Sequence, residues 1–265
     1  MNLDDDTGAD DPGAQLERVA EAMEAIVDDS LRHDSPAGYF AAMYLGVTRV
    51  VRAGIDAGIF ATPRRLELLT SVFARRYIDA WHRYNATGAD PATPPASWTV
   101  AFDAARTWRP TVLQHLLLGM NAHINLDLGI ASAEVAPGAS IDDLRPDFDE
   151  INNVLAGHVQ GIQRQLNRIS PLYRFVDDVS GSIDRSVINF SIARARAEAW
   201  KLARFLATAE TDAAAQRVEA HDRIVAAIGQ AIVHPGAVSS TGLLALRVTE
   251  RRSPRVITEI FARPQ

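Results

Sequence analysis

The chain has 265 residues, and 47% of them are hydrophobic, which is enough to build the core of a globular domain. Its net charge of −6, its isoelectric point of about 5.6 and the lack of a basic stripe argue against nucleic acid as a partner. The absence of cysteine excludes disulfides, thiolate catalysis and cysteine-based metal sites.

The residue composition also indicates the kind of organism that the protein comes from and the cellular compartment in which it resides. Lys201 is the only lysine, and the accompanying richness in arginine and alanine indicates a GC-rich bacterial genome. We find neither a secretory signal nor an apolar run long enough to span a membrane. We therefore expect a cytoplasmic protein that does not associate with membranes.

The chain divides into three parts. Residues 1–13 are acidic and almost without apolar groups, and they predict a disordered tail. Residues 14–235 carry apolar residues at helical spacing and predict a single all-α domain of about eight helices. The helical segments cover about 15–31, 37–57, 63–84, 98–108, 110–132, 148–168, 171–179, 183–209 and 211–233. Residues 236–265 form a C-terminal extension, whose β-branched residues allow a short β-hairpin or a further helix.

A cluster of polar residues interrupts the most apolar helix, in the stretch "QHLLLGMNAHINLDLG" (114–129). On a helix, His115, Gly119, His123 and Asp127 stack along one face. His123 and Asp127 are four residues apart, so their side chains can share one cation or one hydrogen bond. Gly119 leaves space beside this pair.

The other polar residues of the stretch surround this pair. His115 lies roughly 12 Å from His123 along the helix axis, too far to bind the same metal but able to line the same cavity. Asn121 and Asn125 project about a quarter turn or more away from the line. We expect His123, Asp127, His115, Asn121 and Asn125 to form the catalytic pocket. Alternatively, they are a buried cluster that satisfies its own hydrogen bonds.

A histidine and a carboxylate at this spacing form half of a site for zinc or non-haem iron. His158 is in phase with the apolar face of a neighbouring helix and is the candidate third ligand of one divalent metal. A metal-bound water would then be the nucleophile in hydrolysis. Without a metal, Asp127 would orient His123, which would act as a general acid–base.

Several segments resemble a family of helical proteins of unknown function, found mainly in actinobacteria. The resemblance covers roughly residues 35–210 and implies an all-α fold without naming a reaction. It is carried by "YFAAMYLGVTRVV" (39–51), "LLTSVFARRYIDA" (68–80), "PASWTVAF" (95–102), "LLLGMNAHINLDL" (116–128), "RPDFDEINNVL" (145–155) and "FSIARARAEAWKLARFL" (190–206).

A second resemblance is local. The stretch "AHINLDLG" (122–129) is similar to the "AHxxGDxHQPLH" helix of the zinc phospholipase C and P1 nuclease family. That resemblance implies zinc ligation by His123 and Asp127. The histidine that follows the aspartate in the family pattern is missing here, so the resemblance does not extend to a trinuclear zinc centre.

Other polar residues have competing interpretations. Asp147 is interpreted as the cap of its own helix, or as a catalytic acid. Arg76 lies either on a solvated face or in a site for an anionic group. Arg194 and Arg196 are interpreted as members of ion pairs on a long helix, and Arg194 could also bind a substrate carboxylate or phosphate.

These observations predict an enzyme whose small-molecule substrate binds between helices. Its reaction would be hydrolysis, or a cyclisation or rearrangement in bacterial specialised metabolism. The alternative is a non-catalytic helical module that binds an apolar ligand or a partner subunit. A homo-oligomer is compatible with either function.

Overall fold

The computed structural model describes residues 11–86, 93–170, 172–173, 192–250 and 253–263, with the backbone alone at 156–160 and 237–240. Within these ranges the chain forms eleven α-helices and no strand. They are α1 (Pro12–Arg32), α2 (Ala37–Asp56), α3 (Pro63–Asn85), α4 (Ala96–Ala105), α5 (Val112–Ala122), α6 (Leu128–Val135), α7 (Arg145–Ile169), α9 (Ile192–Thr208), α10 (Thr211–Val233), α11 (Ala237–Thr249) and α12 (Pro254–Ala262).

The all-α prediction is confirmed, but the number of helices was predicted too low. The helix expected at 110–132 is two helices, α5 and α6, joined by the π-helical turn η1 (His123–Asp127). A 3₁₀ turn, η2 (Gly138–Leu144), leads into α7. The described part of the C-terminal extension forms α11 and α12, so the helical alternative is correct there and the hairpin is wrong. The helix expected at 171–179 and residues 1–10 of the expected tail fall largely outside the described residues.

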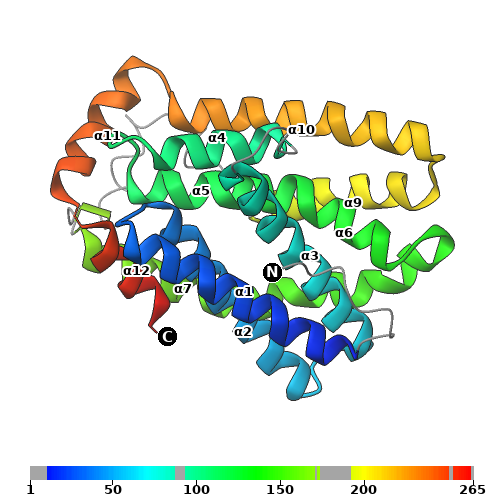
Figure 1. The fold of residues 1–265 in the computed structure, drawn as a ribbon. Helices are drawn as coiled ribbons and strands as arrows, with labels where there is room; N and C mark the ends of the chain where they lie inside the picture. The colour runs from blue at the N-terminus through cyan, green and yellow to red at the C-terminus, as the bar shows by residue number, and fades with distance from the viewer. Residues whose placement is uncertain (1–10, 87–92, 171, 174–191, 251–252, 264–265) are drawn as a thin grey trace.

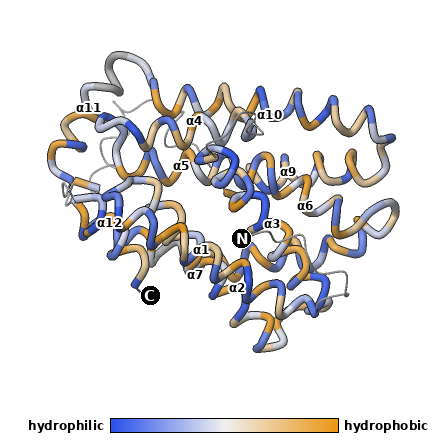
Figure 2. The backbone as a smooth tube through the Cα atoms, viewed as in Figure 1, coloured by the Kyte–Doolittle hydropathy of each residue, from blue (hydrophilic) through white to orange (hydrophobic). Residues whose placement is uncertain are grey.

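The continuous rod of α5, η1 and α6 forms the centre of the molecule. It is contacted by α2, α3, α4, α9 and α10. In Figure 1, α10 runs along one side with α4 and α9 next to the rod, while α1, α2 and α12 lie on the other side. A helix that is apolar all round is stable only when it is surrounded. By contrast, α10 alternates between hydrophilic and hydrophobic segments along its length (Figure 2).

Close approach of α6 and α9 depends on a glycine. A Cβ atom at Gly129 would lie 2.8 Å from the carbonyl oxygen of Ala199 and 2.9 Å from the side chain of Leu202. Any larger residue would push α9 away from the rod. The small residue therefore sets the distance between the rod, which carries His123, and α9, which carries Arg196.

The N-terminus of the rod is capped locally. Thr111 and Gln114 form a capping box, in which the backbone N–H of Gln114 donates to the Thr111 hydroxyl and the backbone N–H of Thr111 donates to the side-chain oxygen of Gln114. The side-chain N–H of Gln114 donates to the carbonyl oxygen of Ile232 in α10, at 2.7 Å. The same residue thus starts α5 and fixes it to α10.

Other helix N-termini are capped by carboxylates from distant parts of the chain. Asp147 accepts hydrogen bonds from the backbone N–H groups of Ala61 and Thr62 at 2.7 and 2.8 Å, at the start of α3. Asp147 is therefore not the cap of its own helix, as the sequence had indicated, because its carboxylate reaches the N-terminus of α3. The same arrangement recurs with Asp222 at α4, Glu250 at α5 and Asp34 at α12.

The C-terminal helices pack on the same core. α12 contacts α1, α2 and α7. Glu250, at the end of α11, accepts from the backbone N–H of Val112 at 2.9 Å and from the hydroxyl of Tyr173. Burial raises the pKa of Glu250, and the hydrogen bonds it receives oppose this shift. In the part of the chain that the structure describes, no helix combines the length and the apolar character that crossing a bilayer requires.

The Asp147 cap makes a stability prediction. Asp147→Ala leaves two backbone N–H groups and the hydroxyl of Thr62 without a partner, so we expect the free energy of unfolding to fall by about 2–3 kcal/mol. Asp149→Ala is the matched control, because Asp149 lies on the same helix and its carboxylate forms an exposed ion pair with Arg145 instead of a helix cap. That control should change stability by less than about 1 kcal/mol. Urea unfolding checks both, and equal losses in the two variants would contradict the assignment.

Candidate functional site

The rod changes its winding where the polar cluster lies. The backbone N–H of Leu128 donates to the carbonyl oxygen of His123, five residues earlier, which defines the π turn of η1. Such turns widen a helix locally and occur frequently at functional sites. The side chains of His123 and Asp127 flank this turn and are both buried.

Asp127 receives hydrogen bonds from three different elements. Its Oδ2 atom lies 2.9 Å from Nε1 of Trp98 in α4 and 3.1 Å from Nδ1 of His123. Its Oδ1 atom lies 3.3 Å from Nε of Arg76 in α3. Arg76 therefore does not lie on a solvated face: it is the cation that pairs with the buried carboxylate.

The two nitrogens of His123 have different environments. Because the Asp127 carboxylate accepts hydrogen bonds, Nδ1 of His123 carries the proton and donates it. Burial lowers the pKa of His123, partly opposed by Asp127 and reinforced by Arg76, so the ring is neutral at neutral pH. Nε2 is then an unprotonated base. It is buried and has no hydrogen-bond partner among the described residues.

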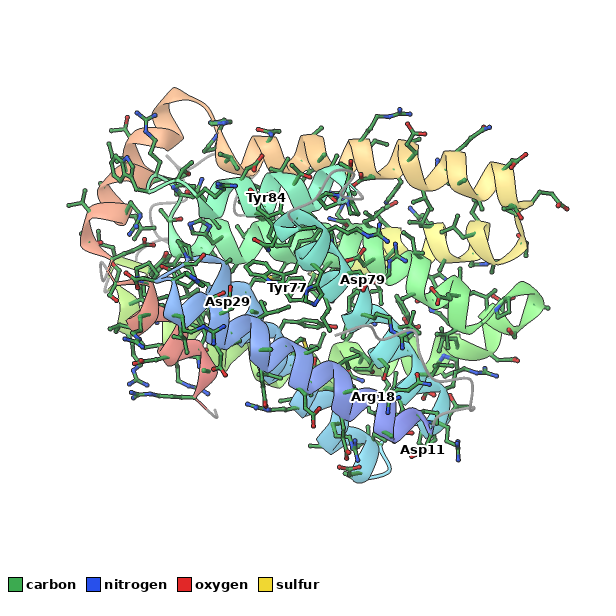
Figure 3. The ribbon with its side chains drawn as sticks, viewed as in Figure 1. Asp11, Arg18, Asp29, Tyr77, Asp79 and Tyr84 are labelled. Atoms are coloured by element: carbon green, nitrogen blue, oxygen red, sulfur yellow. The ribbon has the colours of Figure 1, made fainter. Side chains whose placement is uncertain are left out.

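Aromatic rings hold the imidazole in place. Phe73 stacks on His123 with a centroid distance of 3.6 Å and an interplanar angle of 6°, and the Tyr44 ring forms a T-shaped pair with it at a centroid distance of 4.4 Å. Tyr77 lies in the middle of the molecule (Figure 3), within 5.0 Å of the Trp98 ring. This packing leaves His123 little freedom to turn its free nitrogen elsewhere.

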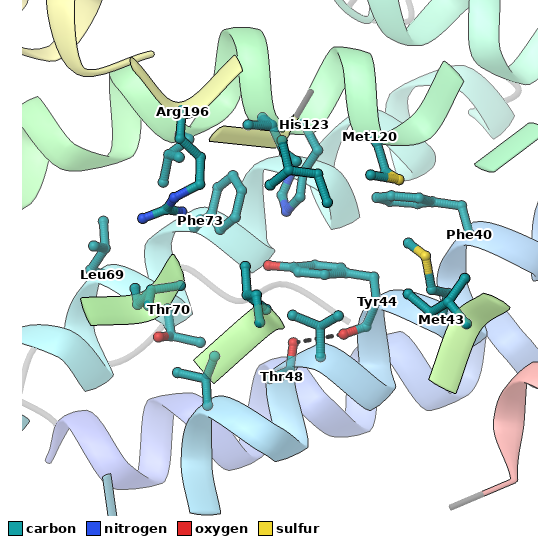
Figure 4. A pocket seen from close by; sticks show the side chains of 18 residues that line it. Phe40, Met43, Tyr44, Thr48, Leu69, Thr70, Phe73, Met120, His123 and Arg196 are labelled. Carbon is teal, nitrogen blue, oxygen red and sulfur yellow. Dashed lines mark hydrogen bonds between the residues drawn. The ribbon is translucent and has the colours of Figure 1, made fainter. Parts of the chain in front are cut away.

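A cavity of about 100 Å³ lies against His123. Figure 4 shows a ring nitrogen of His123 directed into it, between Phe73 and Tyr44. The polar groups of its wall are His123, Tyr44, Thr48, Thr70 and Arg196. The apolar wall consists of Phe40, Met43, Val47, Val51, Leu69, Phe73, Met120, Ile124, Leu128, Ile151, Leu155, Ile162 and Ile192.

The polar groups of the wall differ in whether they are satisfied. The hydroxyls of Thr48 and Thr70 donate to backbone carbonyl oxygens of their own helices. The hydroxyl of Tyr44 is buried and has no partner among the described residues. Burial, together with the charge of Asp127, raises the pKa of Tyr44 well above its ordinary value, and the nearby hydroxyl of Thr48 only partly opposes this, so the phenol stays neutral and can donate.

Only one of the five predicted catalytic residues lines this cavity. His115 packs edge-on against Tyr39 and borders a separate space of about 20 Å³. Gly119 does not leave room beside His123, because Phe40 occupies it: a Cβ atom at Gly119 would lie 2.4 Å from the Phe40 ring. The expectation that His115 and His123 share one cavity is therefore wrong, since a ring fills the turn between them.

The two asparagines belong to a hydrogen-bonded ladder toward α10. Asn121 donates to the carbonyl oxygen of Val225 at 2.9 Å, and Asn125 donates to the side-chain oxygen of Asn121 at 3.0 Å. His221 of α10 bonds the backbone carbonyl of Asn125 at 3.0 Å. Asn121 and Asn125 thus fix α10 to the rod, and the cavity lies elsewhere.

The described residues do not fit a metal centre at Asp127. They contain no group of three histidine, aspartate or glutamate side chains that could hold an ion. Both oxygens of Asp127 already accept hydrogen bonds, one of them from the Arg76 cation, which repels a metal. His158, the expected third ligand, belongs to α7 but its side chain lies outside the described residues. We therefore derive no chemistry through zinc or iron.

The sequence reasoning missed the role of Arg196. This side chain is 4% exposed and lines the cavity from α9. It is in helical phase with the buried residues Ala199 and Ala203, and this phase was the available signal. The indole of Trp98 and the pairing of Arg76 carried no signal, because their partner is distant in sequence.

The chain belongs to a family of unknown function, DUF5995, whose model matches residues 16–235. The matched range contains the whole cavity and ends before α11. Comparison with curated proteins and with solved structures gave no match. These comparisons therefore lend no support to the likeness with zinc phospholipase C and P1 nuclease, and the geometry of the site is the remaining indication of function.

Burial of His115 predicts a pH dependence of stability. Burial, reinforced by the charge of Arg247, lowers the pKa of His115 to about 3. Below about pH 6.5 the unfolded chain binds a proton that the folded chain does not, so stability falls as the pH decreases toward 3. The contribution is about 1.4 kcal/mol for each pH unit, and above pH 6.5 it is constant.

His115→Phe should remove this contribution, because phenylalanine does not titrate and keeps a ring against Tyr39. Urea unfolding of both proteins between about pH 4.5 and 7.5 measures the difference in slope. Parallel pH profiles would show that His115 is protonated in the folded protein and would contradict the assignment.

Proposed function

We propose that this member of a family of unknown function is a small-molecule enzyme in which His123 transfers protons to and from a compact apolar substrate. One observation carries the proposal. Nε2 of His123 is buried without a partner and faces an apolar cavity, while Nδ1 is bonded to a buried carboxylate. A base oriented by a carboxylate on its far nitrogen is a common arrangement for general acid–base catalysis.

Asp127 supports both halves of the proton transfer. It fixes the tautomer that leaves Nε2 unprotonated, and its charge stabilises the imidazolium that forms when Nε2 takes up a proton. Trp98 and Arg76 hold the carboxylate in turn, so it cannot rotate away. Asp127 touches His123 and not the cavity, and it is a positioning residue.

The size of the cavity favours a rearrangement or a cyclisation over hydrolysis. A cavity of about 150 Å³ accommodates benzene, so about 100 Å³ suits a hydrocarbon body of roughly four carbon atoms and leaves little room for an additional water. Nε2 would remove a proton from one substrate carbon and return it at another. The substrate is isomerised, His123 ends neutral, and no further reactant is consumed.

The second candidate function is a non-catalytic module that binds a small apolar ligand. The wall of the cavity favours this function, because it is aliphatic or aromatic except at the polar groups named above. The two functions differ in what His123 must do, because a binding module does not need an unprotonated Nε2. The following two experiments separate them.

The tautomer of His123 tests the proposal without knowledge of the substrate. We expect nitrogen-15 NMR of the histidine rings to show a proton on Nδ1 of His123 and none on Nε2 between about pH 7 and 8. Asp127→Asn should move the proton to Nε2, because an amide can donate to Nδ1. A wild-type ring with its proton on Nε2 would contradict the role of His123 as a base.

Deuterium exchange tests the chemistry. Butanone and 2-oxobutanoate are small enough for the cavity and carry acidic C–H bonds, so we expect the protein to accelerate their exchange in deuterium oxide. His123→Gln should lower the enzymatic rate by about 10²–10⁴-fold, and Asp127→Asn should lower it as well. His115→Phe, a change of the other buried histidine of the rod, should retain the rate. If exchange is no faster than in buffer while both compounds bind, the binding module is the better function.

A further inference from the structure

One end of the cavity is built to hold a charge. In Figure 4 the guanidinium group of Arg196 and the hydroxyl of Tyr44 lie toward the end formed by Leu69 and Thr70. Phe40, Met43 and Met120 form the opposite end. The space between them therefore has a polar end and an apolar end, with the ring of His123 between the two.

Arg196 is a buried cation, and its contacts with Phe148 in the described part of the chain are with neutral groups. Its Nη2 donates to the carbonyl oxygen of Phe148, and its guanidinium carbon lies 4.3 Å from the centre of the Phe148 ring. Its Nε is buried with no partner among the described residues. A guanidinium has five N–H groups, and a buried charge without a counterion is costly.

Asp149, whose charge acts on Arg196, does not form an ion pair with it. Asp149 is paired with Arg145 at 2.6 Å on the surface of α7, and no ion pair to Arg196 occurs within the described part of the chain. The charges of Asp149 and Arg145 act on Arg196 in opposite directions. Burial lowers the pKa of Arg196 to about 10, so it stays a cation at neutral pH. Among the residues that the structure describes, Arg196 is thus a positive charge without a counterion at the wall of an apolar cavity.

We infer that Arg196 is the anion-binding residue of this cavity and that its ligand is a small monocarboxylate with a compact apolar body. A carboxylate matches the planar fork of a guanidinium and would receive two N–H groups from it. The hydroxyl of Tyr44 is a further donor at the same end. The hydrocarbon part would then lie toward Phe40, Met43 and Met120.

A carboxylate fits better than a phosphate. The described wall holds one cation and one free hydroxyl, which suit a single negative charge. A phosphate carries more charge and usually receives several backbone N–H groups or a helix N-terminus. The cavity size limits the body to roughly the size of benzene or less.

This inference rests on the proposed binding of a substrate in the cavity, and it places the carboxylate so that the adjoining carbons face His123. Arg196 would then position the substrate and decide its class, while His123 would carry out the proton transfer. The two roles belong to different helices, α9 and the rod, and can be removed separately.

Binding of isovalerate tests the inference. Isovaleramide has the same shape without the charge. We expect calorimetric titration of the full chain to show isovalerate binding about tenfold or more tighter than isovaleramide. Arg196→Met, which keeps the length of the side chain and removes the charge, should abolish this preference. Arg194→Met is the matched control on the same helix, at an exposed position, and should retain it.

Stability provides a second readout, in case Arg196→Met alters the fold. If Arg196 serves a ligand, its replacement by an apolar residue should leave the melting temperature unchanged or raise it, because an unpaired buried charge is removed. Isovalerate should raise the melting temperature of the wild type and of Arg194→Met but not of Arg196→Met. A large loss of stability in Arg196→Met, with isovalerate binding retained, would make Arg196 a structural residue and overturn the inference.

Three other results would also overturn it. These are equal affinities for isovalerate and isovaleramide, tighter binding of inorganic phosphate than of isovalerate, and no binding of isovalerate up to tens of millimolar. The fate of the proposed function is read separately. If the wild-type protein prefers isovalerate to isovaleramide but does not accelerate deuterium exchange, the inference holds and catalysis fails. If the protein accelerates the exchange of butanone as much as that of 2-oxobutanoate, and binds isovalerate no more tightly than isovaleramide, catalysis holds and the inference fails.

Discussion

The carboxylate of Asp127 joins the elements on which the candidate site depends. A charge that is 1% exposed requires donors, and it obtains them from α3, α4 and the π turn. Each of these bonds also has a local consequence. Arg76 neutralises the charge, Trp98 anchors α4 against the rod, and His123 is fixed in the tautomer that exposes Nε2 to the cavity. Without Asp127, a cation and two ring nitrogens would lose their partner in the interior.

The polar groups of the interior are of two kinds, and the difference shows which residues belong to the candidate site. Gln114, Asn121 and Asn125 have their hydrogen bonds satisfied within the protein, so they hold helices together. Around the cavity, Nε2 of His123, the hydroxyl of Tyr44 and Nε of Arg196 are buried without partners among the described residues. Native proteins rarely leave such groups unpaired, and the gathering of three of them around one apolar space supports the proposed binding of a ligand there.

Cohesion between distant parts of the chain comes largely from carboxylates at helix N-termini. Asp147 caps a helix 85 residues before it, Asp222 caps one 126 residues before it, and Glu250 one 138 residues before it. A helix N-terminus offers free N–H groups and a positive dipole, so a carboxylate there satisfies both. Because each cap joins two elements, these helices stabilise one another only in the assembled fold.

What the sequence by itself determined follows from local geometry. Helical periodicity predicted the all-α fold, and the spacing of four residues predicted that His123 and Asp127 interact, because both depend only on the path of one helix. Spacing could not show that Phe40 separates His115 from His123, or that the asparagines face α10. The positions of Arg196, Tyr44 and the cavity between them were decided by tertiary structure alone, since they depend on how α2 and α9 pack on the rod and how α7 packs on α2. The cost of a buried charge becomes visible only when its surroundings are known.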